Sequence, residues 1–176
     1  MKQSLLVPLL AVFASAGVRA DGFTLESASF GPNTTLATKH VYNKSECNGG
    51  NVSPELHWSG APAGTKSFAV TMFDPDARGG VGWWHWLLFD IDAKTTSLEA
   101  GAGAAAGTSA KNDFGETGYG GPCPPRGDKP HHYVFTVYAL GTEHLGVDAN
   151  AGAAAVKSAL EANALLSTSL QALYGR

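Results

Sequence analysis

Charged residues are scarce in this chain. Only 15% of its 176 residues are Asp, Glu, Lys or Arg, and acidic residues outnumber basic ones by 15 to 12, which gives a formal net charge of −3. Proteins that bind nucleic acids or anionic membrane surfaces carry clusters of Lys and Arg, because these partners are polyanions. A mildly acidic chain without basic runs therefore argues against nucleic acid as a partner.

The sequence also lacks an apolar run of the roughly 20 residues that a transmembrane helix needs. The stretch from Leu5 to Phe13 is shorter, follows a lysine and precedes the small-residue pattern Val18-Arg19-Ala20, as in an export signal. We therefore expect a signal peptide over residues 1–20, cut after Ala20, and a single periplasmic or secreted domain over residues 21–176 without stable membrane insertion. An uncleaved N-terminal anchor is the alternative.

Cysteine is rare, and only Cys47 and Cys123 are present. In an exported protein such a pair predicts one disulfide. The bridge would close a long loop and stabilise the fold by roughly 4 kcal/mol in the chain-entropy model. Two buried free thiols are the alternative, and we favour the bridge slightly.

Common catalytic signatures are missing as well. The chain has no G-x-S-x-G nucleophile elbow, no H-E-x-x-H zinc helix and no G-x-x-x-x-G-K-[ST] phosphate loop. We therefore expect neither an enzyme nor a bound cofactor. The remaining enzymatic alternative is a metal-dependent hydrolase with zinc on Asp74, His85 and His131, which is less favoured because no two of these residues are closely spaced.

Strand patterns are what the sequence has in quantity. Three segments with many β-branched and aromatic residues predict strands, namely Lys66 to Phe73, Trp83 to Ile91 and Tyr133 to Leu140. The second is apolar almost throughout, which is typical of a strand buried on both faces. Phe23 to Ser29 and Leu170 to Tyr174 predict two further short strands near the ends of the domain.

Loops and one helix complete the expected organisation. Residues 49–63 and 93–110 are rich in small and polar residues and predict loops. Asp148 is expected to cap a helix in which Val156, Leu160 and Ala164 share a face. Because the strands come first and the helix comes late, the order favours a mostly β fold of the α+β class, with an antiparallel-rich sheet and peripheral helices.

Polar residues in or beside these strands are the candidates for a site. Asp74 follows the first strong strand, His85 lies inside the second and His131 precedes the third. If the strands are neighbours, a carboxylate and two imidazoles meet at one end of the sheet, and such imidazoles suit a small anion or a phosphate group. Each residue also has a plainer explanation: Asp74 could cap a turn, and His85 could be a hydrogen-bonded core residue.

The neighbours of His131 add a geometric constraint. Adjacent residues of a strand face opposite sides, so only one of His131 and His132 can enter a site, and Tyr133 would share the face of His131. The remaining histidines lie singly in loop-like contexts and are assigned no role; they are His40, His57 and His144.

Several motifs along the chain resemble the phosphatidylethanolamine-binding (Raf kinase inhibitor-like) family, and its bacterial exported branch most closely. They are Asp74-Pro75-Asp76-Ala77, Trp84-His85-Trp86, Gly121-Pro122-Cys123-Pro124-Pro125 and His131-His132-Tyr133, supported by Asn51-Val52-Ser53-Pro54, Trp58-Ser59-Gly60-Ala61-Pro62 and Leu173-Tyr174-Gly175-Arg176. The resemblance runs from about Phe23 to Arg176.

This resemblance implies a central antiparallel sheet, a second smaller sheet and a shallow pocket for phosphate-like or carboxylate-like anions. Carried over position by position, it assigns ligand binding to Asp74, Asp76, His85, Pro125, His131 and Tyr133. Arg78 stands where the family usually has proline, which would loosen that loop or add a cation near the mouth. Asn163 and Leu166 also depart from the family pattern, and they put in doubt a pocket contact and the packing of a homodimer through that segment.

We therefore expect a soluble exported protein that binds a small anionic or phosphorylated ligand. His85 and His131 would donate hydrogen bonds to ligand oxygens, and Asp74 would orient one imidazole and fix its tautomer. The alternative is an interaction protein that inhibits a protease or a kinase, in which the pocket is regulatory or incidental.

Overall fold

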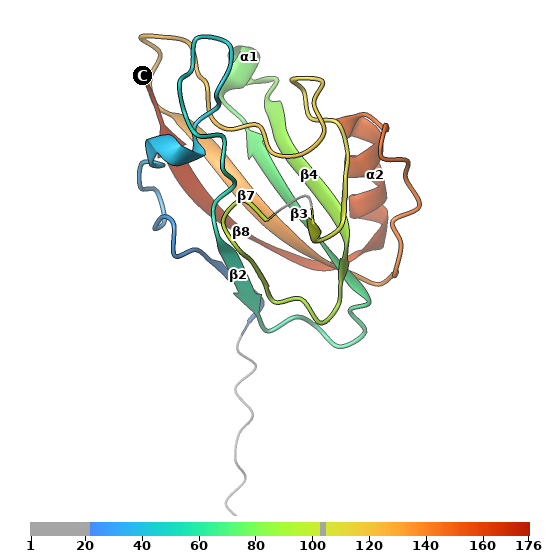
Figure 1. Ribbon diagram of the computed structural model, residues 1–176. Coiled ribbons are helices and arrows are strands. Elements are labelled where there is room, and N and C mark those ends of the chain that lie inside the picture. The colour runs from blue at the N-terminus through green and yellow to red at the C-terminus, as the bar shows by residue number, and fades with distance from the viewer. Residues whose placement is uncertain (1–21, 103–104) are drawn as a thin grey trace, which may run out of the picture.

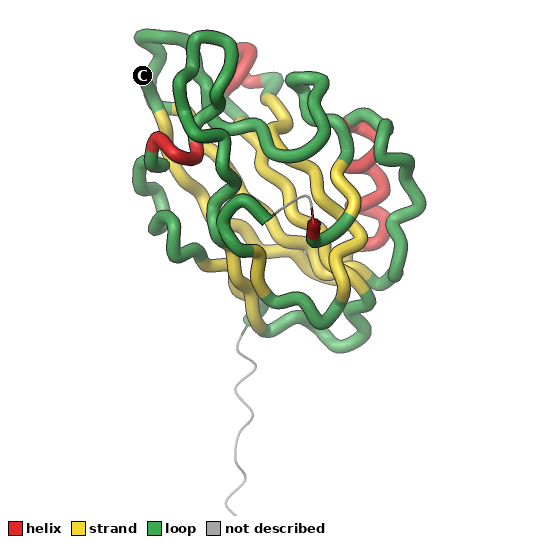
Figure 2. The backbone as a smooth tube through the Cα atoms, in the orientation of Figure 1, coloured by secondary structure: helices red, strands yellow, loops and turns green. Residues whose placement is uncertain are grey.

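The computed structural model describes residues 22–102 and 105–176, so the expected signal peptide over residues 1–20 lies outside the described residues. The described chain forms two antiparallel sheets with few helices (Figures 1 and 2). The strands are β1 Thr24–Glu26, β2 Leu56–Ser59, β3 Ser67–Asp74, β4 Trp83–Asp92, β5 Ser97–Leu98, β6 Thr108–Ser109, β7 His131–Leu140 and β8 Ala164–Tyr174. The helices are the 3-10 turn η1 Thr38–His40, α1 Ala77–Gly80 and α2 Ala153–Asn163.

The larger sheet has the strand order β6-β4-β3-β7-β8, and the smaller has the order β1-β2-β5. All pairings between these strands are antiparallel. The mostly β, α+β fold with a central antiparallel sheet and a smaller second sheet is confirmed. The three strongest predicted strands form its centre as β3, β4 and β7, each within two residues of the predicted bounds.

Two apolar layers cover the two faces of the larger sheet. Alternating residues of β3 divide between them: Val70 and Met72 join one layer and Ala69 joins the other. The first layer is shared with the small sheet through residues such as Leu56 and Trp58. The second is shared with α2, which lies beside the large sheet in Figure 1. The sheet is therefore buried on both faces, as the apolar run in β4 predicts.

Two segments predicted as loops contain strands. The segment 49–63 includes β2, which pairs with β1 and β5 and buries Leu56 and Trp58. The segment 93–110, of which residues 103 and 104 lie outside the described residues, includes β5 and β6. These strands have two to four residues each. Runs this short, bordered by Gly and Pro, give too little periodicity to be distinguished from loop sequence.

The prediction for the C-terminal region was also partly wrong. Gly152, in extended conformation, occupies the N-cap position of α2, and Asp148 instead accepts a hydrogen bond from the Asn150 N–H in the preceding turn. Val156 and Leu160 are buried as expected. The last strand is not short: β8 spans 11 residues and begins at Ala164, directly after the helix. Its first half is largely exposed, so it lacks the alternation that marks a strand in sequence.

Antiparallel pairing places the candidate residues at one end of the large sheet. β3 lies between β4 and β7, so its last residues lie beside the first residues of both neighbours. Asp74 pairs with Trp83 of β4, and Phe73 pairs with Val134 of β7. Loops and α1 surround this end of the sheet, at the top of Figure 2.

Candidate functional site

Asp74 is the buried carboxylate of the site, with 2% of its surface exposed. Its Oδ1 accepts hydrogen bonds from the backbone N–H groups of Asp76, at 2.9 Å, and Ala77, at 3.1 Å. Its Oδ2 lies 2.8 Å from Nδ1 of His131. Asp74 therefore caps the turn after β3 and also orients the imidazole of His131. The expectation that it would fix the tautomer of one imidazole agrees with this contact, since Nδ1 must carry a proton to donate to a carboxylate.

His131 and His132 face opposite sides of β7, as predicted. His131 and Tyr133 are buried, whereas Nδ1 of His132 lies at the surface, 2.7 Å from Oδ2 of Asp76. The backbone N–H of His132 donates to the same oxygen. Burial acts to raise the pKa of the Asp76 carboxyl, but the hydrogen bonds from His132 outweigh it and hold that pKa below its ordinary value. Asp76 is therefore ionised, and its carboxylate links the start of α1 to the start of β7.

His85 reaches the pocket through an irregularity in β4. Trp86 pairs with Met72, and Trp84 pairs with Phe73, so His85 is an extra residue between two consecutive pairs. Such a β-bulge changes which side a residue faces. Trp86 and Tyr133 belong to the same apolar layer, so strict alternation would turn His85 away from Tyr133. Instead, the rings of His85 and Tyr133 form a T-shaped pair with a centroid distance of 5.3 Å.

The hydrogen bond of His85 determines which of its ring nitrogens carries the proton. Nδ1 lies 2.7 Å from the carbonyl oxygen of Gly120, and because a carbonyl only accepts, Nδ1 carries the proton. Burial lowers the pKa of His85 to about 4, so the ring is neutral at neutral pH and Nε2 is an acceptor. In this arrangement Nε2 of His85 is an acceptor, whereas the sequence-based expectation assigned His85 a donor role.

Tyr133 supplies a hydroxyl group to the same wall. Its Oη is buried and has no hydrogen-bond partner among the described residues. Burial raises the pKa of the phenol most, followed by the charge of Asp74, with a smaller hydrogen-bond contribution from the same carboxylate, so the group remains an O–H donor. A buried hydroxyl without a partner costs about 1–3 kcal/mol, and a ligand oxygen in the pocket would satisfy it.

These groups line one pocket with a volume of about 260 Å³. All six residues assigned to ligand binding contribute to it: Asp74, Asp76, His85, Pro125, His131 and Tyr133. Arg78 also lines the pocket, and its guanidinium carbon lies 5.8 Å from the centre of the Trp83 ring, within the range of a cation–π contact. The structure therefore brings the six residues predicted from the sequence together around one pocket.

Sequence reasoning missed part of the wall. Trp83, Phe114 and Asp128 line the pocket, and Nε2 of His131 lies 3.6 Å from Oδ2 of Asp128. The loop that carries Phe114 is organised by the buried side chain of Asn112, whose Oδ1 accepts the backbone N–H groups of Phe114 and Glu116. The glycine-rich run around this loop was the available signal in the sequence, because glycine permits a close approach of the backbone.

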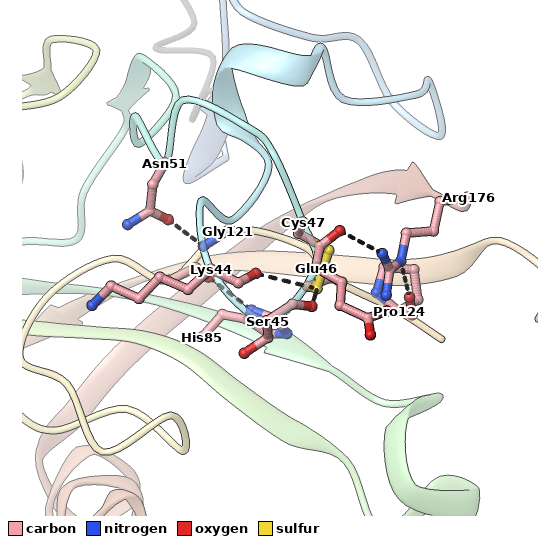
Figure 3. Close-up of a disulfide and its surroundings, with 11 residues drawn as sticks. Lys44, Ser45, Glu46, Cys47, Asn51, His85, Gly121, Pro124 and Arg176 are labelled. Carbon is pink, nitrogen blue, oxygen red and sulfur yellow. Dashed lines mark hydrogen bonds between the residues drawn. A yellow bond between two sulfur atoms is a disulfide. The ribbon is translucent and has the colours of Figure 1, made fainter. Parts of the chain in front are cut away.

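The other wall of the pocket contains the proline loop, residues 121–125, which is held by a disulfide. Cys47 and Cys123 are bridged, which confirms the predicted disulfide, and Cys123 itself lines the pocket. Figure 3 shows Arg176 beside the bridge, with Nε donating to the Pro124 carbonyl at 2.7 Å and Nη1 donating to the Glu46 carbonyl at 2.9 Å. The side chain of Arg176 therefore joins the same two segments that the disulfide joins.

A close backbone contact explains one glycine in this wall. A Cβ on Gly121 would lie 2.2 Å from the carbonyl oxygen of His40, so no other residue fits without movement. The N–H of Gly121 donates to Oδ1 of Asn51 at 2.8 Å, which is also visible in Figure 3. The segment of Gly120 and Gly121 is therefore held between His40 and Asn51. This places the Gly120 carbonyl where it accepts the Nδ1 proton of His85.

Two other properties concern the described residues as a whole. Among residues 22–102 and 105–176, no group of three or more His, Cys, Asp or Glu side chains is arranged to hold a metal ion. Within the same ranges, every helix falls short of the length and apolar character needed to cross a bilayer.

Comparison with known proteins gives consistent matches. The family model for phosphatidylethanolamine-binding protein matches residues 26–175. The chain is 44% identical over 179 residues to YbcL of Escherichia coli strain K12, with 98% of each chain covered. It is 42% identical over 145 residues to YbhB of the same organism, with 79% of this chain and 91% of YbhB covered.

Structural similarity extends over the same region. The crystal structure of E. coli YbcL, described as a new member of the mammalian PEBP family, matches with a TM-score of 0.84 and 45% identity, covering 88% of this chain and 98% of that chain. LppC of Mycobacterium tuberculosis, which is named as a lipoprotein, is 46% identical over 94 residues, or 53% of this chain and 46% of LppC.

Proposed function

Because the chain belongs to the phosphatidylethanolamine-binding protein family, we propose that it is a binding protein for a small anion or a phosphate head group. The pocket at Asp74, His85 and His131 is the proposed site. The observation that carries this proposal is the buried hydroxyl of Tyr133 on the pocket wall, which lies near the Asp74 carboxylate but makes no hydrogen bond of normal geometry to any described residue. A ligand oxygen supplies the acceptor that this group lacks.

Two further groups suit an anion. Nδ1 of His131 is held by Asp74, so Nε2, which lies 3.6 Å from Oδ2 of Asp128, is the ring nitrogen that can meet a ligand. The guanidinium of Arg78 stands on the pocket wall as a permanent cation. Cys123 and Pro125 contribute apolar surface to another side of the pocket. The volume of the pocket suits a ligand as small as a head group.

We also propose that the protein is exported. The Cys47–Cys123 disulfide supports this proposal, because structural disulfides persist in oxidising compartments and are rare in the cytosol. The lipoprotein relative and the predicted cleavage after Ala20 point the same way. Cell fractionation with detection of the mature N-terminus tests this proposal, and recovery of the uncut chain from the cytosol would contradict it.

The binding proposal is tested by NMR titration of the mature protein with inorganic phosphate and phosphoethanolamine, following the histidine ring signals. Saturable shifts confined to His85 and His131 are the expected result. The signal of His144 serves as an internal control, since its side chain is 83% exposed and lies outside the pocket lining.

A matched pair of variants sharpens this titration. His131→Asn retains an N–H in the place of Nδ1 to donate to Asp74 but removes Nε2, so it should weaken phosphate binding about tenfold or more while the fold persists. His144→Asn should leave binding unchanged. Absence of any shift at millimolar ligand would contradict the proposal and favour the alternative of an interaction protein with an incidental pocket.

A further inference from the structure

The pocket contains an acceptor where an anion site would ordinarily present a donor. The Gly120 carbonyl holds the proton of His85 on Nδ1, at 2.7 Å, and the adjacent Gly121 is bound to Asn51 and packed closely against the backbone of His40. His85 is 3% exposed and lines the pocket, so Nε2 presents a lone pair to any ligand held there. Burial keeps the pKa of this ring low, and the ring stays neutral at physiological pH.

The charges around the pocket also disfavour a ligand oxygen that carries full negative charge. Carboxylates from Asp74, Asp76 and Asp128 line it, while Arg78 is the permanent cation among the lining residues. The titratable and charged groups that face His85 or the pocket are Asp74, Asp76, Arg78, Asp113, Asp128, His131 and Tyr133. A ligand oxygen that carries full negative charge would therefore be repelled by the lone pair of His85 and by the carboxylates, whereas a hydroxyl would be attracted.

On the basis of the anion pocket proposed above, we infer that this site selects oxyanions that still carry a proton. Inorganic phosphate and the monoanion of a phosphate monoester are such ligands. Their P–OH group donates to Nε2 of His85, and their remaining oxygens accept from Tyr133 and His131. Sulfate and phosphate diesters carry no proton on oxygen near neutral pH, so they cannot make the first contact.

The inference separates two sources of the same phosphate chemistry. A free phosphate or a monoester head group can donate a proton to His85, but the diester phosphate of an intact phospholipid cannot. The pocket is therefore expected to prefer inorganic phosphate or a monoester to the diester linkage.

The test compares matched anions by calorimetry or NMR at pH 6, where the second pKa of a phosphate monoester leaves roughly half of it singly protonated. Phosphate and sulfate have nearly the same size, and methyl phosphate differs from dimethyl phosphate by one methyl group and one proton. We expect phosphate to bind about 10- to 100-fold more tightly than sulfate, and methyl phosphate to bind more tightly than dimethyl phosphate.

His85→Asn is the diagnostic variant. Its amide N–H takes the place of Nδ1 and donates to Gly120, while the acceptor at Nε2 is removed and water can serve either ligand. The preference for phosphate over sulfate should fall toward one in this variant and remain intact in His144→Asn.

The outcomes distinguish this inference from the proposal beneath it. Equal affinities of the wild-type protein for phosphate and sulfate would overturn proton selection and leave the anion pocket standing. Binding of neither anion would overturn both. A preference that persists unchanged in a folded His85→Asn variant would overturn the assignment of selection to His85.

Discussion

Asp74 and His131 are 57 residues apart in the sequence, and in the structure Oδ2 of Asp74 lies 2.8 Å from Nδ1 of His131. The other oxygen of the same carboxylate closes the turn after β3 by accepting the N–H groups of Asp76 and Ala77. Turn capping and orientation of an imidazole are therefore carried out by one buried side chain. Any change to this carboxylate should alter stability and binding together.

Asp74→Asn is predicted to impair both. An amide has one acceptor oxygen, so it can accept from the turn or from the Nδ1–H of His131 but not from both; keeping the turn forces His131 into its other tautomer or leaves a buried donor without an acceptor. We expect a loss of about 1–3 kcal/mol in the free energy of unfolding, measured in urea, and phosphate binding weakened about tenfold or more.

Asp92→Asn is the matched control for this change. Oδ1 of Asp92 accepts a single backbone N–H, from Lys94 at 2.7 Å, in an exposed turn away from the pocket. It should cost less than about 1 kcal/mol and leave phosphate affinity unchanged. If Asp74→Asn behaves no differently from this control, the double role of Asp74 is wrong.

His85 is predicted to make stability depend on pH in the weakly acidic range. Burial lowers its pKa from 6.5 to about 4, so between these values the unfolded chain binds a proton that the folded protein does not. The contribution of neutral His85 to the free energy of unfolding is complete above about pH 6.5 and is lost as the pH falls toward 4. One pKa unit corresponds to about 1.4 kcal/mol, so the full loss from this residue is about 3 kcal/mol.

Urea unfolding of the wild type and His85→Asn at several pH values between 7 and 4 isolates this contribution. The asparagine keeps a donor to Gly120 and does not titrate, so its stability should fall less steeply with acid. His40 also has a pKa lowered chiefly by burial, but it is present in both proteins and cancels in the difference. Parallel curves for the two proteins would contradict the assignment.

The parts of the fold predicted from sequence are those with long, consistent patterns. β3, β4 and β7 have 8 to 10 residues, rich in β-branched and aromatic side chains, and they form the centre of the sheet. Asp74 and His131 lie at ends of these strands, and antiparallel pairing then brings them together. Local sequence and tertiary arrangement agree here, so single-sequence reasoning succeeds.

The parts that it missed depend on partners that are distant in sequence. β8 is stabilised by pairing with β7 over nearly its whole length, not by alternation of its own residues. The bulge that turns His85 toward Tyr133 is visible only in the register of two strands. The tautomer of His85 was out of reach of the sequence for the same reason, because it depends on the Gly120 carbonyl, which lies 35 residues away.

The disulfide is predicted to stabilise the fold and the pocket. Cys47 and Cys123 are 76 residues apart, so the bridge restricts a long loop in the unfolded chain. Replacement of both by alanine should lower the free energy of unfolding by about 2–5 kcal/mol. Because Cys123 lines the pocket, phosphate affinity should also fall, and an unaltered affinity would show that the proline loop keeps its place without the bridge.

Arg176 provides a second link between the segments that the disulfide joins, through the carbonyl groups of Glu46 and Pro124. Arg176→Gln should therefore cost about 1–2 kcal/mol when the disulfide is present. Without the disulfide the same change should cost more, because the proline loop is then held against the segment around Glu46 only by the remaining contacts, such as the hydrogen bond from the Tyr42 N–H to the Pro122 carbonyl. Arg126→Gln, which removes an exposed cation from the same loop, is the control and should be close to neutral.

A double-mutant cycle measures this coupling. Unfolding in urea and phosphate affinity are determined for the wild type, Arg176→Gln, the double alanine variant at Cys47 and Cys123, and the combination of all three changes. Redundant links predict a combined loss that exceeds the sum of the separate losses by about 0.5–3 kcal/mol. Additive losses would mean that Arg176 and the disulfide stabilise the loop independently, and the shape of the pocket wall would then depend on each link separately.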